Sequence, residues 1–173
     1  MISPLDAAAV AAQLGRMPRG QMVVAHRCPC GLPDVVQTAP RLPDGSPFPT
    51  LYYLTCPRAA AAVSTLEAAG VMRDMTARLG GGTDGAEKLR ADYAAAHRDY
   101  LARRDEAARS ADVEPLPPGT QSAGGMPERV KCLHALVAHE LAAGGNPFGR
   151  EALDAIGDWF TAGPCVPVPG EDT

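Results

Sequence analysis

The 173-residue sequence has few aromatic residues, few lysines and no long apolar run. Aromatic side chains make up only 5% of the chain, so a buried core must rest mainly on alanine, leucine and valine. Lysine occurs only at Lys88 and Lys131, the net charge is −4, and no basic block stands out, so nucleic-acid binding is not expected. No stretch approaches the roughly 18 apolar residues that a membrane-spanning helix requires.

The first residues of the chain lack the basic region and the apolar stretch of a secretory signal peptide. We therefore expect a cytoplasmic protein. In that reducing compartment, the five cysteines are expected to be free thiols or metal ligands rather than structural disulfides. The hydrophobic fraction of 46% and the charged fraction of 21% are ordinary for a folded domain.

The order of apolar and turn residues predicts an α+β fold, with a small, mostly antiparallel sheet in residues 21–55 packed against five or six helices. Strands are expected at 21–25, 34–39 and 50–55, and a Pro-Asp-Gly turn favours a hairpin between the last two. Helices are expected at 3–14, 57–69, 71–79, 84–109, 127–143 and 151–160. Together they predict one globular domain, residues 1–162, and a flexible proline-rich tail, 163–173.

Two cysteines one residue apart, Cys28 and Cys30, follow the first predicted strand, and Cys56 follows the third. The intervening proline stiffens the turn, and the amides of such a turn can point at the sulfurs and stabilise thiolate charge. Cys56 directly precedes a helix, whose N-terminal dipole also favours a thiolate. These are the requirements of zinc or iron–sulfur ligation, although metal-free, buried cysteines are the third alternative.

The fourth ligand is expected from the helix at 127–143. There Cys132 and His134 are two positions apart, about 200° around a regular helix, so their side chains should point to opposite sides. Cys132 and His139 share a face but lie roughly 10 Å apart along the axis. At most one of the three can then join a single metal site while the helix stays regular, and Cys132 is the best candidate because it completes four thiols. Cys165, in the tail, is not included.

Several other polar residues flank the predicted thiol site and are candidates for orienting the ligands or for binding a small anion. Ordinary roles, as core histidines and solvated loop arginines, stay open for them. The candidates are His26, Arg27, Arg58, Lys131 and His134.

These residues favour a metal-binding protein with thiolate ligands, with zinc preferred over an iron–sulfur cluster, that binds another protein or a small anion. One alternative is an enzyme that uses the same pocket, with Cys132 or a metal-bound water as the reactive group. Another is a metal-free interaction protein. No Walker-type loop, dinucleotide fingerprint, zinc-protease motif or nucleophile elbow points to a particular reaction.

Several segments of the chain also carry a family resemblance. About residues 8 to 155 resemble the actinobacterial family called domain of unknown function 501 (DUF501). The resemblance implies a single cytoplasmic domain and brings no established activity with it. The matching segments are CPCGLPDVV at 28–36, PRLPDG at 40–45, PTLYYLT at 49–55, GVMRDM at 70–75 and SAGGMPERVKCLHALVAH at 122–139.

Overall fold

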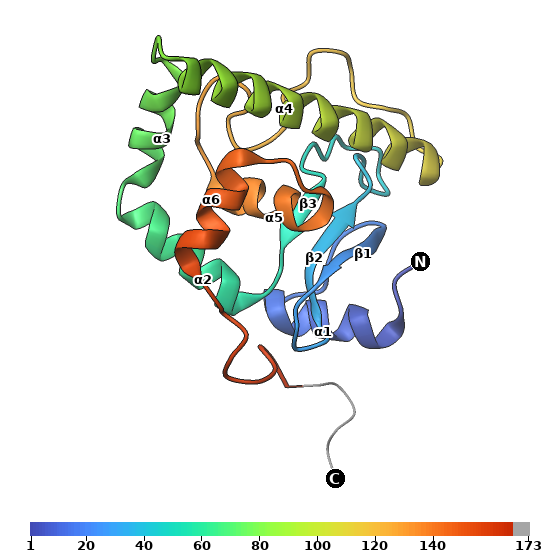
Figure 1. The fold of residues 1–173 in the computed structure, drawn as a ribbon. Helices are drawn as coiled ribbons and strands as arrows, with labels where there is room; N and C mark the ends of the chain where they lie inside the picture. Colours follow the sequence, from blue (N-terminus) through green and yellow to red (C-terminus); the bar gives the residue numbers. More distant parts are fainter. Residues whose placement is uncertain (168–173) are drawn as a thin grey trace.

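A computed structural model describes residues 1–167, which form six α-helices and one three-stranded antiparallel sheet (Figure 1). The predicted α+β class is therefore confirmed. Residues 168–173, most of the predicted tail, lie outside the described part of the chain.

The sheet consists of β1 (Met22–Arg27), β2 (Pro33–Thr38) and β3 (Tyr52–Leu54), in the order β1-β2-β3. In the central strand, Val36 pairs with Val24 on one side and with Tyr53 on the other. The predicted hairpin is confirmed, since β2 and β3 are antiparallel neighbours. The central strand is almost wholly buried, with Val35 and Val36 in the core and Asp34 and Thr38 among the buried polar residues.

The helices surround this sheet. Figure 1 shows α4 crossing one side of the molecule, with α5 and α6 in the centre and α1 beside the sheet. Proline occupies the first helical turn of α1, α2 and α6, where its missing N–H costs nothing. The bounds are α1 Pro4–Leu14, α2 Pro57–Ala68, α3 Val71–Leu79, α4 Asp84–Ser110, α5 Leu133–Ala143 and α6 Pro147–Ile156.

The helix predicted at 127–143 begins six residues later, at Leu133. The preceding residues form turns around Gly124, whose carbonyl accepts the backbone N–H groups of Lys131 at 2.7 Å and Cys132 at 3.3 Å. Gly124 has φ +62°, and a Cβ there would overlap the Leu136 side chain, so glycine is required. The predicted start at Pro127 is therefore wrong.

The last helix is also displaced from its predicted position. It runs from Pro147 to Ile156 rather than over 151–160. The residues predicted as a turn include its cap, because the Asn146 side chain accepts the Gly149 N–H at 2.9 Å. A Cβ on Gly149 would overlap the Leu136 carbonyl, which shows how closely α6 packs on α5.

Helix α5 occupies the centre of the core and is buried on nearly all sides. It packs against β3, α6 and α2, and its buried residues include Leu136, Val137 and His139. The His139 ring packs against the rings of both Tyr52 and Tyr100, at centroid distances of 6.0 and 5.3 Å, and these two rings also contact each other. This arrangement joins the sheet to α4 through α5.

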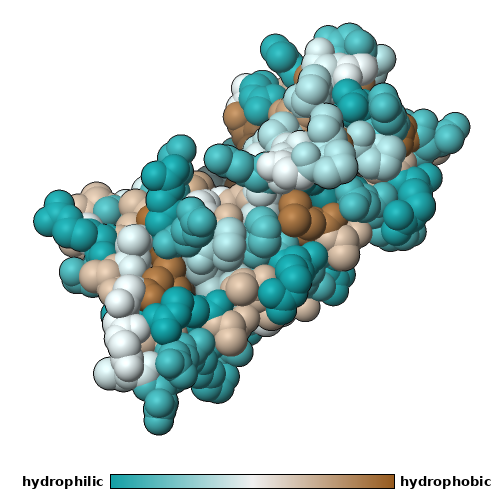
Figure 2. All heavy atoms as spheres, turned by 90° about the horizontal axis from the view of Figure 1, so that it is seen from above, coloured by the Kyte–Doolittle hydropathy of each residue, from teal (hydrophilic) through white to brown (hydrophobic). Residues whose placement is uncertain are grey.

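The surface is largely polar. The face that carries α4 is mostly hydrophilic, and apolar residues show there only as small, separate patches (Figure 2). Within residues 1–167, no helix has both the length and the apolar character that a membrane crossing would need.

Tyr100 tests how α4 is joined to the start of β3. Its hydroxyl accepts the Leu51 N–H at 2.6 Å, and both residues are fully buried. Tyr100→Phe leaves that amide without a partner, so we expect a loss of about 1–3 kcal/mol in the free energy of unfolding. Urea denaturation followed by circular dichroism measures it. Tyr53→Phe, at a partly exposed ring, is the control, and equal stability of the two variants would contradict this role.

Candidate functional site

A cavity of about 680 Å³ lies between β3, α4, the loop at 119–131 and the first turn of α5. Its wall includes Tyr53 from β3, His97 from α4, and Cys132 and His134 at the start of α5. Lys131 and Arg129, both exposed, also border it. The cavity therefore combines polar and cationic groups with an apolar wall, as ligand sites commonly do.

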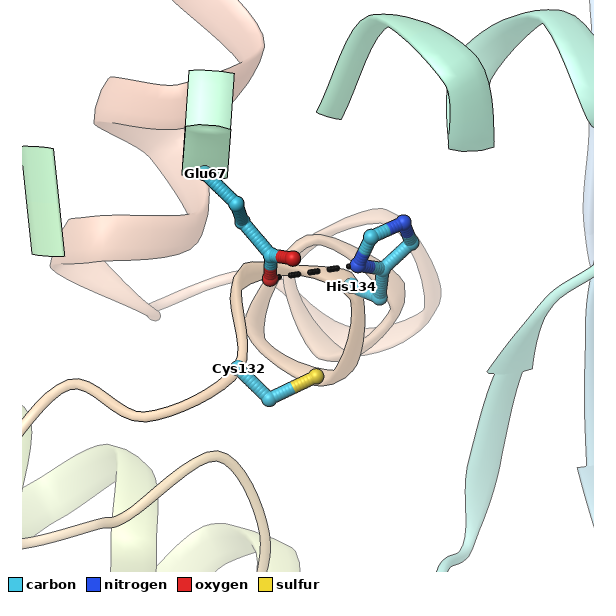
Figure 3. A group of neighbouring side chains, drawn as sticks. All are labelled: Glu67, Cys132 and His134. Carbon is cyan, nitrogen blue, oxygen red and sulfur yellow. Dashed lines mark hydrogen bonds and ion pairs between the residues drawn. The ribbon is translucent and has the colours of Figure 1, made fainter. Parts of the chain in front are cut away.

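Three potential metal ligands meet at one edge of this cavity: Glu67 from α2, Cys132 just before α5, and His134 in its first turn (Figure 3). One ligand atom of each lies within 4.8 Å of those of the other two. Among the described residues, this is the one group of three or more such donors that meets that spacing. All three side chains are partly buried.

Cys132 can reach His134 because it is not part of the helix. Its backbone is extended, with φ −147° and ψ 107°, and it occupies the N-cap position without a capping hydrogen bond from its sulfur. The rotation of 100° per residue therefore does not apply between positions 132 and 134. The prediction that these side chains point to opposite sides is wrong.

Both ring nitrogens of His134 contact residues of α2. Its Nε2 lies 3.1 Å from the Ala60 carbonyl and 3.1 Å from the Ser64 hydroxyl, and its Nδ1 lies 3.2 Å from Glu67 Oε1. When the Ser64 hydroxyl donates to Nε2, the Nδ1–H donates to Glu67. When Nε2 donates to the Ala60 carbonyl, Nδ1 presents a lone pair to the carboxylate and is available as a metal ligand.

Glu67 also has a structural role. Its Oε1 accepts the Leu133 N–H at 2.7 Å, which satisfies one of the free amides at the start of α5. A negative charge there is further stabilised by the helix dipole. The carboxylate is therefore held in place from α5 whether or not an ion is bound.

The other predicted ligands lie elsewhere. Cys28, Cys30 and Cys56 come together near the end of the sheet, but Cys132 does not join them. Cys165, which the sequence prediction left out, contacts both Cys30 and Cys56 and is the fourth cysteine of this group. One signal could have found it: each of the four assembled cysteines is adjacent to a proline, and Cys132 is not.

The flanking candidates have well-defined partners. The His26 Nδ1 lies 2.7 Å from the buried carboxylate of Asp34. Burial raises the pKa of Asp34, and the hydrogen bond to His26 partly offsets this. These two residues form a pair of their own beside the thiols.

The two predicted arginines, Arg27 and Arg58, also form hydrogen bonds within the protein. Arg27 forms a two-pronged ion pair with Asp6, at 2.8 Å for both bonds. Arg58 donates to the carbonyls of Ala162 and Gly163. Of the candidates for binding a small anion, Lys131 and His134 are the two that border the cavity.

The comparisons with known proteins give one match. A family model described as "Protein of unknown function (DUF501)" matches residues 24–154. No curated protein and no solved structure matches the chain.

Substitution of Glu67 separates its two roles. Glu67→Ala removes the acceptor of the Leu133 N–H, so we expect the free energy of unfolding to fall by about 1–2 kcal/mol. Glu67→Gln keeps an acceptor oxygen and should cost less. Thermal and urea denaturation of metal-free protein measure both, with the exposed Glu128→Ala as the control. A Glu67→Ala variant as stable as the control would show that the carboxylate does not cap α5.

Proposed function

Because the chain belongs to the DUF501 family, whose description names no activity, we propose a function from the site itself: a zinc ion bound by Glu67, Cys132 and His134 holds a small anionic ligand in the cavity. The observation that carries the proposal is the convergence of three donor atoms, one each from Glu67, Cys132 and His134, within 4.8 Å of one another. In the tautomer that protonates His134 Nε2, a cation between Nδ1 and the Glu67 carboxylate makes their contact attractive.

The donor set and its spacing suit zinc. Thiolate sulfur, imidazole nitrogen and carboxylate oxygen are its usual protein ligands. Around a tetrahedral ion with bonds of about 2.0–2.1 Å to nitrogen and oxygen, those two atoms lie about 3.3 Å apart. The 3.2 Å between His134 Nδ1 and Glu67 Oε1 agrees with that value. A single cysteine at this position does not suit an iron–sulfur cluster, which requires several thiolates.

Three protein donors leave one position of a tetrahedral ion open. Cys132 and His134 both line the cavity, so a ligand in the cavity can take that position. Lys131 and Arg129 add positive charge at its edge, and Glu128 offsets part of it. The balance favours a small anion, such as a carboxylate or a phosphate group.

The same donor count supports a second candidate function, an enzyme. Zinc sites with three protein ligands and an open position are typical of catalysis, because the ion makes a bound water acidic. In this candidate the water is the reactive group, and Cys132 serves as a ligand.

Both functions require reduced cysteines, so we propose a reducing compartment, the cytoplasm, as the location.

Zinc content tests the proposal directly. We expect Cys132→Ser and His134→Gln each to lose one equivalent of zinc relative to the wild type, because each removes a donor from a three-donor site. Elemental analysis after purification and dialysis with a phosphine reductant measures this loss. Glu128→Ala, which removes an exposed carboxylate that belongs to neither group of donors, is the control and should keep the wild-type zinc content. Unchanged zinc content in both site variants would contradict the proposal.

Azide tests the open coordination position. In protein loaded with Co²⁺, azide should change the visible absorption bands of the cobalt ion in a saturable way, because it can bind where no protein ligand does. Cys132→Ser protein provides the control and should not show that response. A spectrum of the wild type that azide leaves unchanged would mean that the shell is closed, which rules out both the ligand-binding and the enzymatic function.

A further inference from the structure

Four other cysteines, Cys28, Cys30, Cys56 and Cys165, gather where the turn between β1 and β2, the start of α2 and the C-terminal segment meet, and nothing in the proposed function uses them. We infer that they bind a separate zinc ion in a closed four-thiolate shell, which fastens the C-terminal segment to the end of the sheet. This inference is independent of the proposed function, since the two sites share no residue.

The turn between β1 and β2 is built to present two sulfurs. Two backbone hydrogen bonds close it, Gly31 N–H to the Cys28 carbonyl at 2.8 Å and Cys28 N–H to the Leu32 carbonyl at 3.0 Å. Gly31 has φ +91°, a conformation that favours glycine. The turn directs the Cys30 amide at the Cys28 sulfur, at 3.5 Å, and the Leu32 amide at the Cys30 sulfur. Amides aimed at sulfur stabilise the thiolate form that metals bind.

Cys56 comes from the start of α2. It is the N-cap residue, with an extended backbone, and its sulfur makes no capping hydrogen bond. Its side chain is fully buried. The sulfur is therefore free to bind an ion, and the positive end of the α2 dipole lies next to it.

Cys165 is held beside the other three by residues from two helices. Gln13 of α1 donates to the Cys165 sulfur at 3.2 Å and to the Pro33 carbonyl at 2.6 Å. Arg58 of α2 binds the carbonyls of Ala162 and Gly163, just before Cys165. The Cys165 amide and thiol both interact with Cys30, and its thiol also interacts with Cys56. Gln13 and Arg58 therefore hold Cys165 and the residues just before it in place without a bound ion.

The spacing favours one ion over a cluster. The sulfurs are neighbours in the order Cys28, Cys30, Cys165, Cys56, although no three of them lie within 4.8 Å of one another. A tetrahedral zinc ion with bonds of about 2.3 Å needs sulfur separations of about 3.8 Å, so binding would draw the ends of this row together. In an iron–sulfur cluster the thiolates bind different irons and lie farther apart than direct thiol contacts allow.

Zinc analysis with matched cysteine variants tests the inference. Cys165→Ser and Cys30→Ser should each lose one equivalent relative to the wild type, and Cys132→Ser should keep that equivalent. X-ray absorption of the Cys132→Ser protein should show four sulfur ligands at about 2.3 Å. This second measurement needs no change in the four-thiol group, so it stands even where a variant of that group fails to fold.

Trp159, the only tryptophan, provides a structural readout of the same segment. It is partly buried against the core, so chelation of the ion or Cys165→Ser should shift its fluorescence to the red, and Cys132→Ser should not. Wild-type zinc content in Cys165→Ser, or nitrogen and oxygen ligands in the absorption spectrum, would overturn the inference. So would brown protein that contains iron. Loss of zinc in Cys165→Ser but not in Cys132→Ser would support this site and contradict the proposed function.

Discussion

The arrangement of the centre of this protein depends on one carboxylate, that of Glu67, at the start of α5. Helix α5 is buried on nearly all sides, so its first amides cannot rely on water and need a partner within the protein. Glu67 supplies it from α2, by accepting the Leu133 N–H at 2.7 Å. Because the cap comes from another helix, Cys132 at the N-cap position keeps its sulfur free. The contact that stabilises the helix therefore also assembles the candidate metal ligands.

Local signals in the sequence predicted most of the elements. Ser3 followed by Pro4 marked the start of α1, Pro57 marked that of α2, and the Pro-Asp-Gly turn at 43–45 marked the hairpin. Each signal acts within a few residues, so a single sequence contains all of it. Such signals cannot show where a distant residue replaces a local hydrogen bond.

The start of α5 shows this limit. Pro127 resembles a proline in the first turn of a helix, but the residues after it are bound by distant side chains instead. The Tyr93 hydroxyl donates to the Arg129 carbonyl at 2.9 Å, and the Val130 N–H donates to Thr76 Oγ1 at 2.9 Å. These contacts span 36 and 54 positions, so no local pattern reveals them. The error in the boundary then produced the error in the site, because it placed Cys132 inside a helix.

The two candidate sites differ in what the C-terminal segment contributes. The family match ends at residue 154, so it contains Glu67, Cys132 and His134 but not Cys165. Without Cys165, the turn at Cys28 and the start of α2 would offer three thiolates, which is the donor count of an open zinc site. With it, the shell is closed and the ion can only hold structure. The nine described residues after Asp158, which include Trp159 and Cys165, would thus determine whether the proposed second ion is reactive or structural.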